Sequence, residues 1–269
     1  MRRGLGLASL LLGLCSPAAG GPWNAPPGGY YAKASYAYLG TDQLATPLGE
    51  TVGIPTFSRH EGSLYFQYGL TAGLMAVGDL ALVRRTAIED FDAAAGFGDG
   101  RLGLQWQLRR SGPWVLAARG VLQLPTGDET LGEALLPSGS GVWEGEGVAG
   151  AGVSLWQGRG WAFVEAGYQV RGGGLRDGLV YGAQLGRRAG RVLVMANVRG
   201  VQPWDTEPSD LSTGSAAGFG DRTTYLVFGP GLILELGRGL GLQADLDCMA
   251  HTRNIARGTT LRLGLFVSR

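Results

Sequence analysis

Apolar residues alternate with polar or small residues along much of this chain. The segment from Arg101 to Arg109 shows the pattern most clearly, with an apolar face of Leu102, Leu104, Trp106 and Leu108 and a polar face of Arg101, Gly103, Gln105, Gln107 and Arg109. Successive side chains of a β-strand point to opposite faces, whereas a helix would scatter these residues around its circumference. The segment therefore predicts a strand with one apolar and one polar face.

The same alternation returns along the rest of the chain. It predicts strands near residues 30–39, 62–70, 73–85, 97–110, 113–125, 146–157, 160–171, 177–188, 191–202, 222–236, 239–249 and 258–267. These are twelve segments, within a range of ten to fourteen, and 146–157 is weakly patterned because Gly and Ala occupy both of its faces. The pattern predicts an all-β fold, a closed antiparallel transmembrane β-barrel of about 12 strands.

The connections between these segments alternate in length. Tight turns are expected at 71–73, 111–113, 158–160, 189–190 and 237–239, and longer connections at 40–61, 86–96, 125–145, 203–221 and 250–257, with a short one at 172–174. Outer-membrane barrels have tight periplasmic turns and longer outer loops, so both termini are predicted to lie in the periplasm. Acidic residues crowd the predicted outer loops and are interpreted as solvated surface: Glu89, Asp90, Asp92, Asp128, Glu129, Glu133, Glu144, Glu146, Asp205, Glu207 and Asp210.

Two observations favour membrane insertion with lipid of the outer membrane as a partner. Beyond the first 20 residues no apolar stretch reaches the length that a transmembrane helix needs, which leaves a barrel as the membrane-spanning structure. Aromatic residues lie toward the predicted strand ends, where interfacial girdles are found. These residues are Tyr36, Tyr38, Trp106, Trp114, Trp156 and Trp161.

The N-terminus is typical of a secretory signal peptide over residues 1–20. Arg2 and Arg3 precede an apolar run, and small residues allow cleavage after Gly20. Residues 21–269 would then form the barrel, exported to the outer membrane of a Gram-negative envelope. A lipoprotein interpretation of Cys15 is the alternative, although Leu14 stands where a small residue is needed. The barrel-assembly machinery is an expected partner, although Arg269 ends the chain in place of the usual aromatic residue.

Composition and charge exclude several classes. The formal net charge is +1 and the arginines are spread along the chain, so no basic stripe suits a nucleic acid. Glycine is abundant but follows no Gly-X-Y period. Cys248 is the single cysteine beyond the signal segment, which excludes an internal disulfide. No nucleotide-binding loop and no zinc spacing appears, so neither a cofactor nor a metal is expected.

A resemblance rests on three short motifs. The tetrapeptides Gly96-Phe97-Gly98-Asp99 and Gly218-Phe219-Gly220-Asp221 precede two predicted strands, and a third motif runs from Leu64 to Thr71 as Leu-Tyr-Phe-Gln-Tyr-Gly-Leu-Thr. Together they resemble the outer-membrane proteins linked to the meta-pathway of phenol degradation, over most of the chain from Trp23 onward. The resemblance implies a β-barrel transporter of hydrophobic or aromatic compounds, with no defined set of functional residues. The tetrapeptides are interpreted as glycine-rich loop-to-strand junctions, with ligand binding as the alternative.

The polar strand faces predict the lining of the lumen. The expected lining residues are Arg101, Gln105, Gln107, Arg109, Arg119, Gln123, Glu165, Gln169, Gln184, Asn197, Arg199, Gln243, Asp245, Asp247 and Arg262. The charged residues predicted to face inward also include the basic Lys33, Arg85, Arg171 and Arg188 and the acidic Asp79 and Glu235. Because the cations outnumber the anions, the sequence favours a weak preference for anions.

No catalytic site is predicted. His60 and His251 lie in expected outer loops, and a hydrolase centre formed by His60 with Ser63 is kept only as an alternative. Asp245 and Asp247 share one strand face, where a cation site is conceivable but pairing with lumen arginines is preferred. The resulting hypothesis is a passive outer-membrane channel or transporter for small compounds. The alternatives are a non-conducting structural or surface-interaction barrel and a barrel hydrolase. Twelve strands enclose a narrow pore or a plugged lumen.

Overall fold

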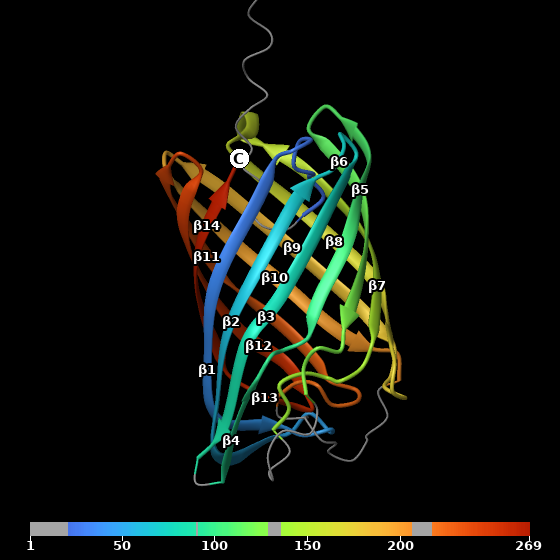
Figure 1. Ribbon diagram of the computed structural model, residues 1–269, viewed down its shortest axis with the longest axis vertical. Coiled ribbons are helices and arrows are strands. Elements are labelled where there is room, and N and C mark those ends of the chain that lie inside the picture. The colour runs from blue at the N-terminus through green and yellow to red at the C-terminus, as the bar shows by residue number, and fades with distance from the viewer. Residues whose placement is uncertain (1–20, 90, 129–135, 206–216) are drawn as a thin grey trace, which may run out of the picture.

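Twelve long antiparallel strands form a closed barrel in the computed structural model, which describes residues 21–89, 91–128, 136–205 and 217–269 (Figure 1). The long strands are β1 (Tyr30–Ala45), β2 (Thr51–Gly69), β3 (Leu74–Ile88), β5 (Gly100–Ser111), β6 (Trp114–Leu124), β7 (Glu144–Leu155), β8 (Gly160–Arg171), β9 (Gly178–Ala189), β10 (Val192–Pro203), β11 (Thr224–Gly237), β12 (Leu240–Arg253) and β14 (Thr259–Ser268). Two short strands, β4 (Asp92–Gly96) and β13 (Ile255–Ala256), and one 3-10 turn, η1 (Trp156–Gly158), complete the described elements.

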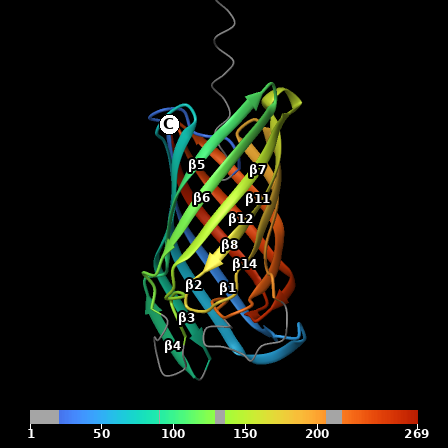
Figure 2. The ribbon, with the colours of Figure 1, turned by 90° about the vertical axis from the view of Figure 1, so that its right-hand side faces the viewer.

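The first and last strands close the barrel. β1 pairs with β2 on one side and with β14 on the other, from Tyr31 opposite Ser268 to Leu39 opposite Thr260. Each remaining long strand pairs with its neighbours in the sequence, so the sheet follows chain order around the barrel (Figures 1 and 2). Closure leaves no long strand with an unpaired edge. The predicted all-β barrel of about 12 strands is confirmed.

The two ends of the barrel differ in their connections. Five tight turns lie at one end, called here the short-turn end, together with the C-terminus. The longer connections lie at the opposite, long-loop end, where β4 and β13 are also found. In the β11–β12 turn, Arg238 adopts a φ of 55° between Gly237 and Gly239, which also have positive φ, so this hairpin depends on left-handed backbone. The predicted alternation of short and long connections is confirmed.

The hairpin of β1 and β2 is longer than the sequence predicted. Residues 40–61 were expected to form a loop, but β1 continues to Ala45 and β2 begins at Thr51. Pairing continues past a bulge at Thr41 and Gln43, and β13 adds hydrogen bonds to Leu44 and Ala45. Partners on both sides satisfy the backbone of this extension, although its side chains show no regular alternation.

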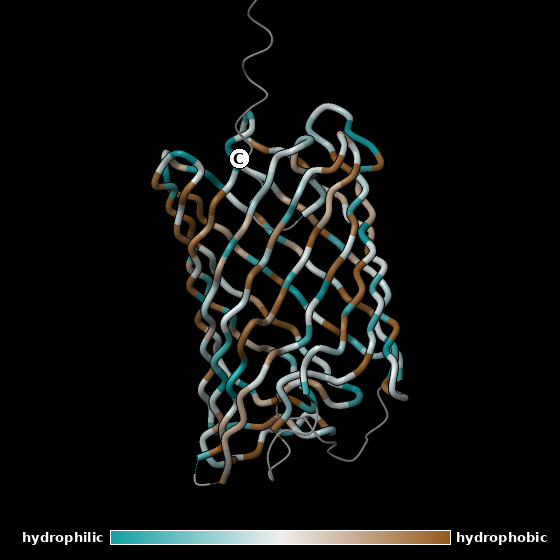
Figure 3. The backbone as a smooth tube through the Cα atoms, viewed as in Figure 1, coloured by the Kyte–Doolittle hydropathy of each residue, from teal (hydrophilic) through white to brown (hydrophobic). Residues whose placement is uncertain are grey.

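The outward face of the strands is apolar. Leu102, Leu104 and Trp106 on β5 expose 37–45% of their surface, and Leu261, Leu263 and Leu265 on β14 expose 45–50%. Figure 3 shows hydrophobic and hydrophilic residues alternating along the strands. An apolar belt around a whole barrel is far larger than the patches that soluble proteins expose, so it needs an apolar surrounding. No helix among the described residues has the length and apolar character needed to cross a membrane.

Candidate functional site: the barrel lumen

The inward face of the strands encloses a central cavity of about 330 Å³. Its charged lining consists of Lys33, Arg101, Arg119, Arg199 and Arg262 with Asp79, Glu146, Glu165, Asp245 and Asp247. Gln184, Asn197 and Gln243 add amide groups, and Tyr65, Val77, Val121 and Phe163 add apolar surface. The lining therefore carries five cations and five anions, so its formal charge is balanced.

Three ion pairs along the lumen wall share one geometry. Arg119 on β6 reaches Glu165 on β8 with 3.1 Å between Nη2 and Oε2, and Arg199 on β10 reaches Asp247 on β12 at 2.6 Å. Arg101 on β5 pairs in the same way with Glu146 on β7. Each pair spans the strand between its two partners. Long side chains with fixed partners narrow the lumen while leaving it polar.

Four further charged groups in the cavity lack a direct ion pair among the described residues: Lys33, Asp79, Asp245 and Arg262. Gln243 connects two of them, because its Oε1 accepts a hydrogen bond from Lys33 Nζ at 3.3 Å and its Nε2 donates to Asp245 at 2.7 Å. Charged groups of both signs that are not locked in pairs can interact with water or with a passing solute.

The segment 21–29 enters the lumen at the short-turn end. The Asn24 side chain and the carbonyl of Gly21 accept hydrogen bonds from Gln105 Nε2, at 3.0 and 3.1 Å. Trp23 packs edge-on against Phe163 with ring centroids 6.3 Å apart. The backbone N–H of Ala25 donates to the sulfur of Met75, and both residues are buried. This segment therefore lies in the short-turn mouth, against β3, β5 and β8.

Glycines on β7 make room for this segment. A side chain at Gly152 would collide with the ring of Trp23, and Gly150 lies beside Pro22. Both glycines lie on the inward face, since Glu144, Glu146 and Val148 precede them at alternate positions. The weak pattern of β7 is thus explained by the close approach of another backbone, a common reason for glycine within a strand.

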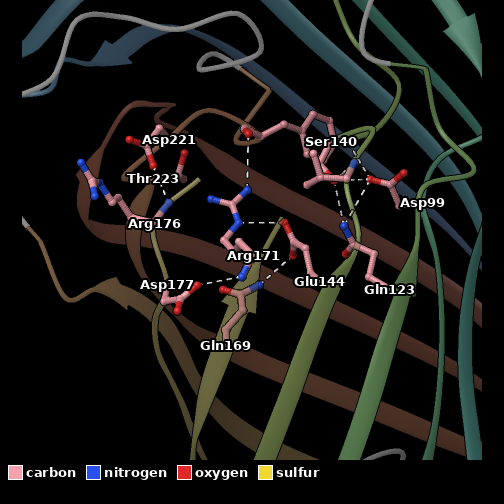
Figure 4. A network of polar contacts seen from close by, with 12 residues as sticks. Asp99, Gln123, Ser140, Glu144, Gln169, Arg171, Arg176, Asp177, Asp221 and Thr223 are labelled. Atoms are coloured by element: carbon pink, nitrogen blue, oxygen red, sulfur yellow. Dashed lines mark hydrogen bonds and ion pairs between the residues drawn. The ribbon is translucent and has the colours of Figure 1, made fainter. Parts of the chain in front are cut away.

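At the long-loop end, Asp99 holds the connection between β6 and β7 (Figure 4). Its carboxylate accepts hydrogen bonds from the backbone N–H groups of Gly127 and Ser140, at 3.0 and 2.6 Å, and from the Ser140 hydroxyl at 2.9 Å. Gln123 donates to the same carboxylate at 3.4 Å. Side chains at Gly127 and Gly139 would collide with this arrangement. Asp99 therefore holds a neighbouring loop against the barrel mouth.

Asp221 in the second tetrapeptide has the same role. Its Oδ1 accepts the backbone N–H of Arg176 at 2.7 Å, which ties the segment before β11 to the β8–β9 connection. Arg171 lies between the two networks, because it pairs with Glu144 at 2.8 Å and donates to the carbonyls of Phe219 and Gly220, both at 3.4 Å. Both Gly-Phe-Gly-Asp motifs are loop-to-strand junctions whose aspartate holds an adjacent loop.

An apolar cluster fills the long-loop mouth beside these networks. Leu39, Phe57, Leu136, Ala217 and Ala256 are buried together, and Phe219 packs against them. The guanidinium of Arg84 lies 4.8 Å from the centroid of the Phe219 ring and pairs with Glu61 at 2.6 Å. This cluster lies at the end of the barrel opposite segment 21–29.

Solved outer-membrane channels share this fold. An outer-membrane channel of Pseudomonas putida F1 is similar with a TM-score of 0.68 at 17% sequence identity, over 93% of this chain and 98% of that chain. The NanC porin follows at a TM-score of 0.55 and 6% identity, and the KdgM porin at 0.53 and 7%, each over 88% of this chain. No protein-family description and no curated protein sequence matches the chain. At these identities the similarity shows the fold.

The structure places most of the predicted lining residues inside the barrel. Those that line the central cavity are Arg101, Arg119, Glu165, Gln184, Asn197, Arg199, Gln243, Asp245, Asp247 and Arg262. Gln105 and Gln107 contact Asn24 of the N-terminal segment. Gln123 and Gln169 belong to the networks of the long-loop end.

Three expected orientations differ in the structure. A bulge between Gln107 and Arg109 turns the exposed Arg109 to the face of Leu116, which is the outward face. Arg85 is exposed and lies opposite His60, because a bulge near Val83 changes the alternation of β3. Trp161 points inward instead of joining a girdle, and its indole N–H donates to Gln184 at 2.6 Å. A bulge moves every following side chain to the other face.

Sequence reasoning missed two inward carboxylates. Glu144 and Glu146 were expected in an outer loop, but both lie on the inward face of β7 and pair with Arg171 and Arg101. The run Glu144-Gly-Glu-Gly-Val148 already has a period of two, which was the available signal. With these carboxylates included and Arg85 and Arg109 outside, the excess of inward cations disappears. The expected preference for anions therefore loses its basis.

His60 and Ser63 lie on opposite faces of β2. His60 is paired with Tyr38 on the outward face, and its Nδ1 lies 2.6 Å from the hydroxyl of Tyr36. Ser63 lines the central cavity. A nucleophile and its base must be within hydrogen-bond reach, so these two residues do not form a hydrolytic pair. Of the two strand aspartates, Asp247 pairs with Arg199 as predicted, whereas Asp245 accepts a hydrogen bond from Gln243 and has no ion pair with an arginine among the described residues.

The β8–β9 connection is expected to loosen in acid. Asp177 accepts the backbone N–H of Arg171 at 2.9 Å and the Tyr168 hydroxyl at 2.7 Å, and these bonds lower the pKa of Asp177 below its ordinary 3.8. The ionised Asp177 stabilises the β8–β9 connection fully above pH 3.8, and this stabilisation is lost as the pH falls through the folded-state pKa. Hydrogen exchange at the Arg171 amide should become faster in that acidic range. In D177N the same amide should exchange quickly at every pH. Equal protection in D177N and wild type would contradict this prediction.

Proposed function

We propose that this chain is a passive outer-membrane channel for small compounds. Residues 1–20 act as its signal peptide, the barrel-assembly machinery inserts residues 21–269, and the short turns face the periplasm. The observation that carries the proposal is a closed barrel with an apolar outward belt around a cavity lined by five cations and five anions. Lipid contacts the belt, and solutes cross through the polar interior.

The permeant is a small compound, because the ion pairs leave a narrow lumen. The resemblance to the proteins linked to the meta-pathway of phenol degradation points to hydrophobic or aromatic compounds. Tyr65, Phe163 and Val121 give the cavity apolar surface beside its charges, which suits a solute with an apolar body. We therefore propose that an aromatic compound with one polar group is a suitable permeant.

The purified chain in planar bilayers tests the proposal. Small single-channel currents are expected, with a reversal potential near zero under a potassium chloride gradient because the lining charges balance. Swelling of proteoliposomes in small aromatic alcohols should be faster than in sugars of similar mass. Segment 21–29 at one end and the apolar cluster at the other favour the alternative of a non-conducting barrel. The absence of both currents and swelling would establish that alternative.

Removing one ion pair of the lumen wall should widen the channel. The double variant R119A/E165A deletes two long side chains that meet at 3.1 Å in the lumen. Single-channel conductance is expected to rise, because the cross-section available to water and ions increases. The charge-swapped variant R119E/E165R is the matched control, since it keeps the pair and about the same volume, and its conductance should stay near wild type. Equal conductance in all three proteins would contradict this path for ions.

A further inference from the structure

Arginines with no acidic counterpart surround the short-turn end of the barrel. Arg109, Arg110, Arg159, Arg187, Arg191 and Arg238 are exposed, and none forms an ion pair with another described residue. They come from the β5–β6, β7–β8, β9–β10 and β11–β12 hairpins, so they are spread over four of the five hairpins at this end. One inward-facing arginine near this end, Arg188, is paired with Glu235.

In the part of the chain that the structure describes, no aspartate or glutamate lies on this rim. Every aspartate and glutamate among the described residues lies on a strand or in a connection at the long-loop end, and none falls in a tight turn. Glu235 lies nearest to the rim, and Arg188 already neutralises it. At the long-loop end the arginines do have acidic partners, as in the pairs of Arg176 and Arg222 with Asp205. The two ends of the barrel therefore differ in surface charge.

Exposed aromatic residues lie at the same end as the arginines. Trp106, Trp114 and Trp156 expose 45–58% of their surface near the ends of β5, β6 and β7. The guanidinium of Arg187 lies 5.2 Å from the centroid of the Trp156 ring. Tryptophan prefers the level of lipid headgroups in barrel proteins, so the arginine ring lies at the level where lipid phosphates are found.

We propose that this arginine ring binds the phosphates of anionic phospholipids in the leaflet that faces the short turns. Guanidinium groups bind phosphate through paired hydrogen bonds, and an anionic surface attracts clustered cations. A ring around the barrel suits lipids, which surround the protein, better than a protein partner, which would contact one side. The proposal rests on the membrane insertion proposed above, and it adds the lipid class that the short-turn end prefers.

The test uses residues 21–269 and compares vesicles of phosphatidylcholine alone with vesicles that also contain phosphatidylglycerol. Protease protection in pure phosphatidylcholine first shows whether the barrel inserts, and failure there contradicts the proposed function instead of the lipid preference. Phosphatidylglycerol should raise the thermal midpoint of the inserted wild type, and high salt should reduce the increase. Native mass spectrometry should detect retained phosphatidylglycerol.

The variant R109Q/R110Q/R159Q/R191Q/R238Q should insert and lose most of the increase due to phosphatidylglycerol. A matched comparison uses two doubles: R191Q/R238Q should reduce the increase, whereas R176Q/R257Q at the long-loop end should keep it. The readout is the rise in thermal midpoint that phosphatidylglycerol causes in each variant, so a change in basal stability does not affect the comparison. An inserted wild type without any increase, or an increase retained by the fivefold variant, would overturn the proposal and leave the channel function standing.

Discussion

Deleting residues 22–26 is expected to raise the single-channel conductance severalfold. These residues lie in the short-turn mouth, where Asn24 bonds to Gln105 and Trp23 packs against Phe163. None of them belongs to a barrel strand, and β1 begins only at Tyr30. Their removal exposes Gln105, Gln107 and Met75 to the lumen, and it leaves the closing pairs of β1 with β14 intact. The deletion therefore opens the mouth without opening the barrel.

Two further variants make this result specific. Replacing residues 22–26 by a Gly-Ser segment of equal length keeps a chain in the mouth without its contacts, and its conductance should lie between wild type and the deletion. Trp23→Ala removes the contact with Phe163. It should lower the free energy of unfolding by less than the roughly 3–5 kcal/mol lost with a fully buried tryptophan, because Trp23 is only half-buried. Unchanged conductance in a folded, inserted deletion variant would show that the resistance lies in the central cavity.

The barrel itself could be predicted because one physical rule acts on every strand. A barrel with an apolar outward face and a polar inward face requires alternation, and segments such as Leu102 to Leu108 satisfy that rule without reference to any other part of the chain. The strand count and the turns follow from repeating this local reading. The tight turns fix five strand pairings directly, and the pairings across the longer connections follow chain order as well.

Other parts of the candidate site depend on contacts that local patterns do not contain. The bulge after Gln107 moves Arg109 outward, and no residue type at that position signals it. The path of residues 22–26 into the lumen is set by glycines of β7 more than 120 positions away. Asp99 and Asp221 were visible as a repeated motif, but their role as loop holders required the neighbouring connections of β6–β7 and β8–β9.

Breaking the pair of Glu144 with Arg171 is expected to give the largest loss of stability at the long-loop end. Their side chains expose only 8% and 9% of their surface, and they meet at 2.8 Å. In E144Q the guanidinium of Arg171 stays buried without its carboxylate partner. Such a loss typically lowers the free energy of unfolding by about 3–5 kcal/mol. Gln169 loses its charged acceptor as well, since it donates to Glu144 at 2.8 Å. Urea unfolding in vesicles, followed by tryptophan fluorescence, measures the change.

The double variant E144Q/R171Q decides whether the loss comes from an unpaired charge. Removing both charges leaves two neutral groups that can hydrogen-bond, so the double variant should be more stable than E144Q alone. R171K keeps the charge but loses the planar fork that also reaches the carbonyls of Phe219 and Gly220, and it should show faster hydrogen exchange in the segment before β11. Strictly additive losses in the double variant would mean that the two side chains act separately, through loop packing instead of their shared ion pair.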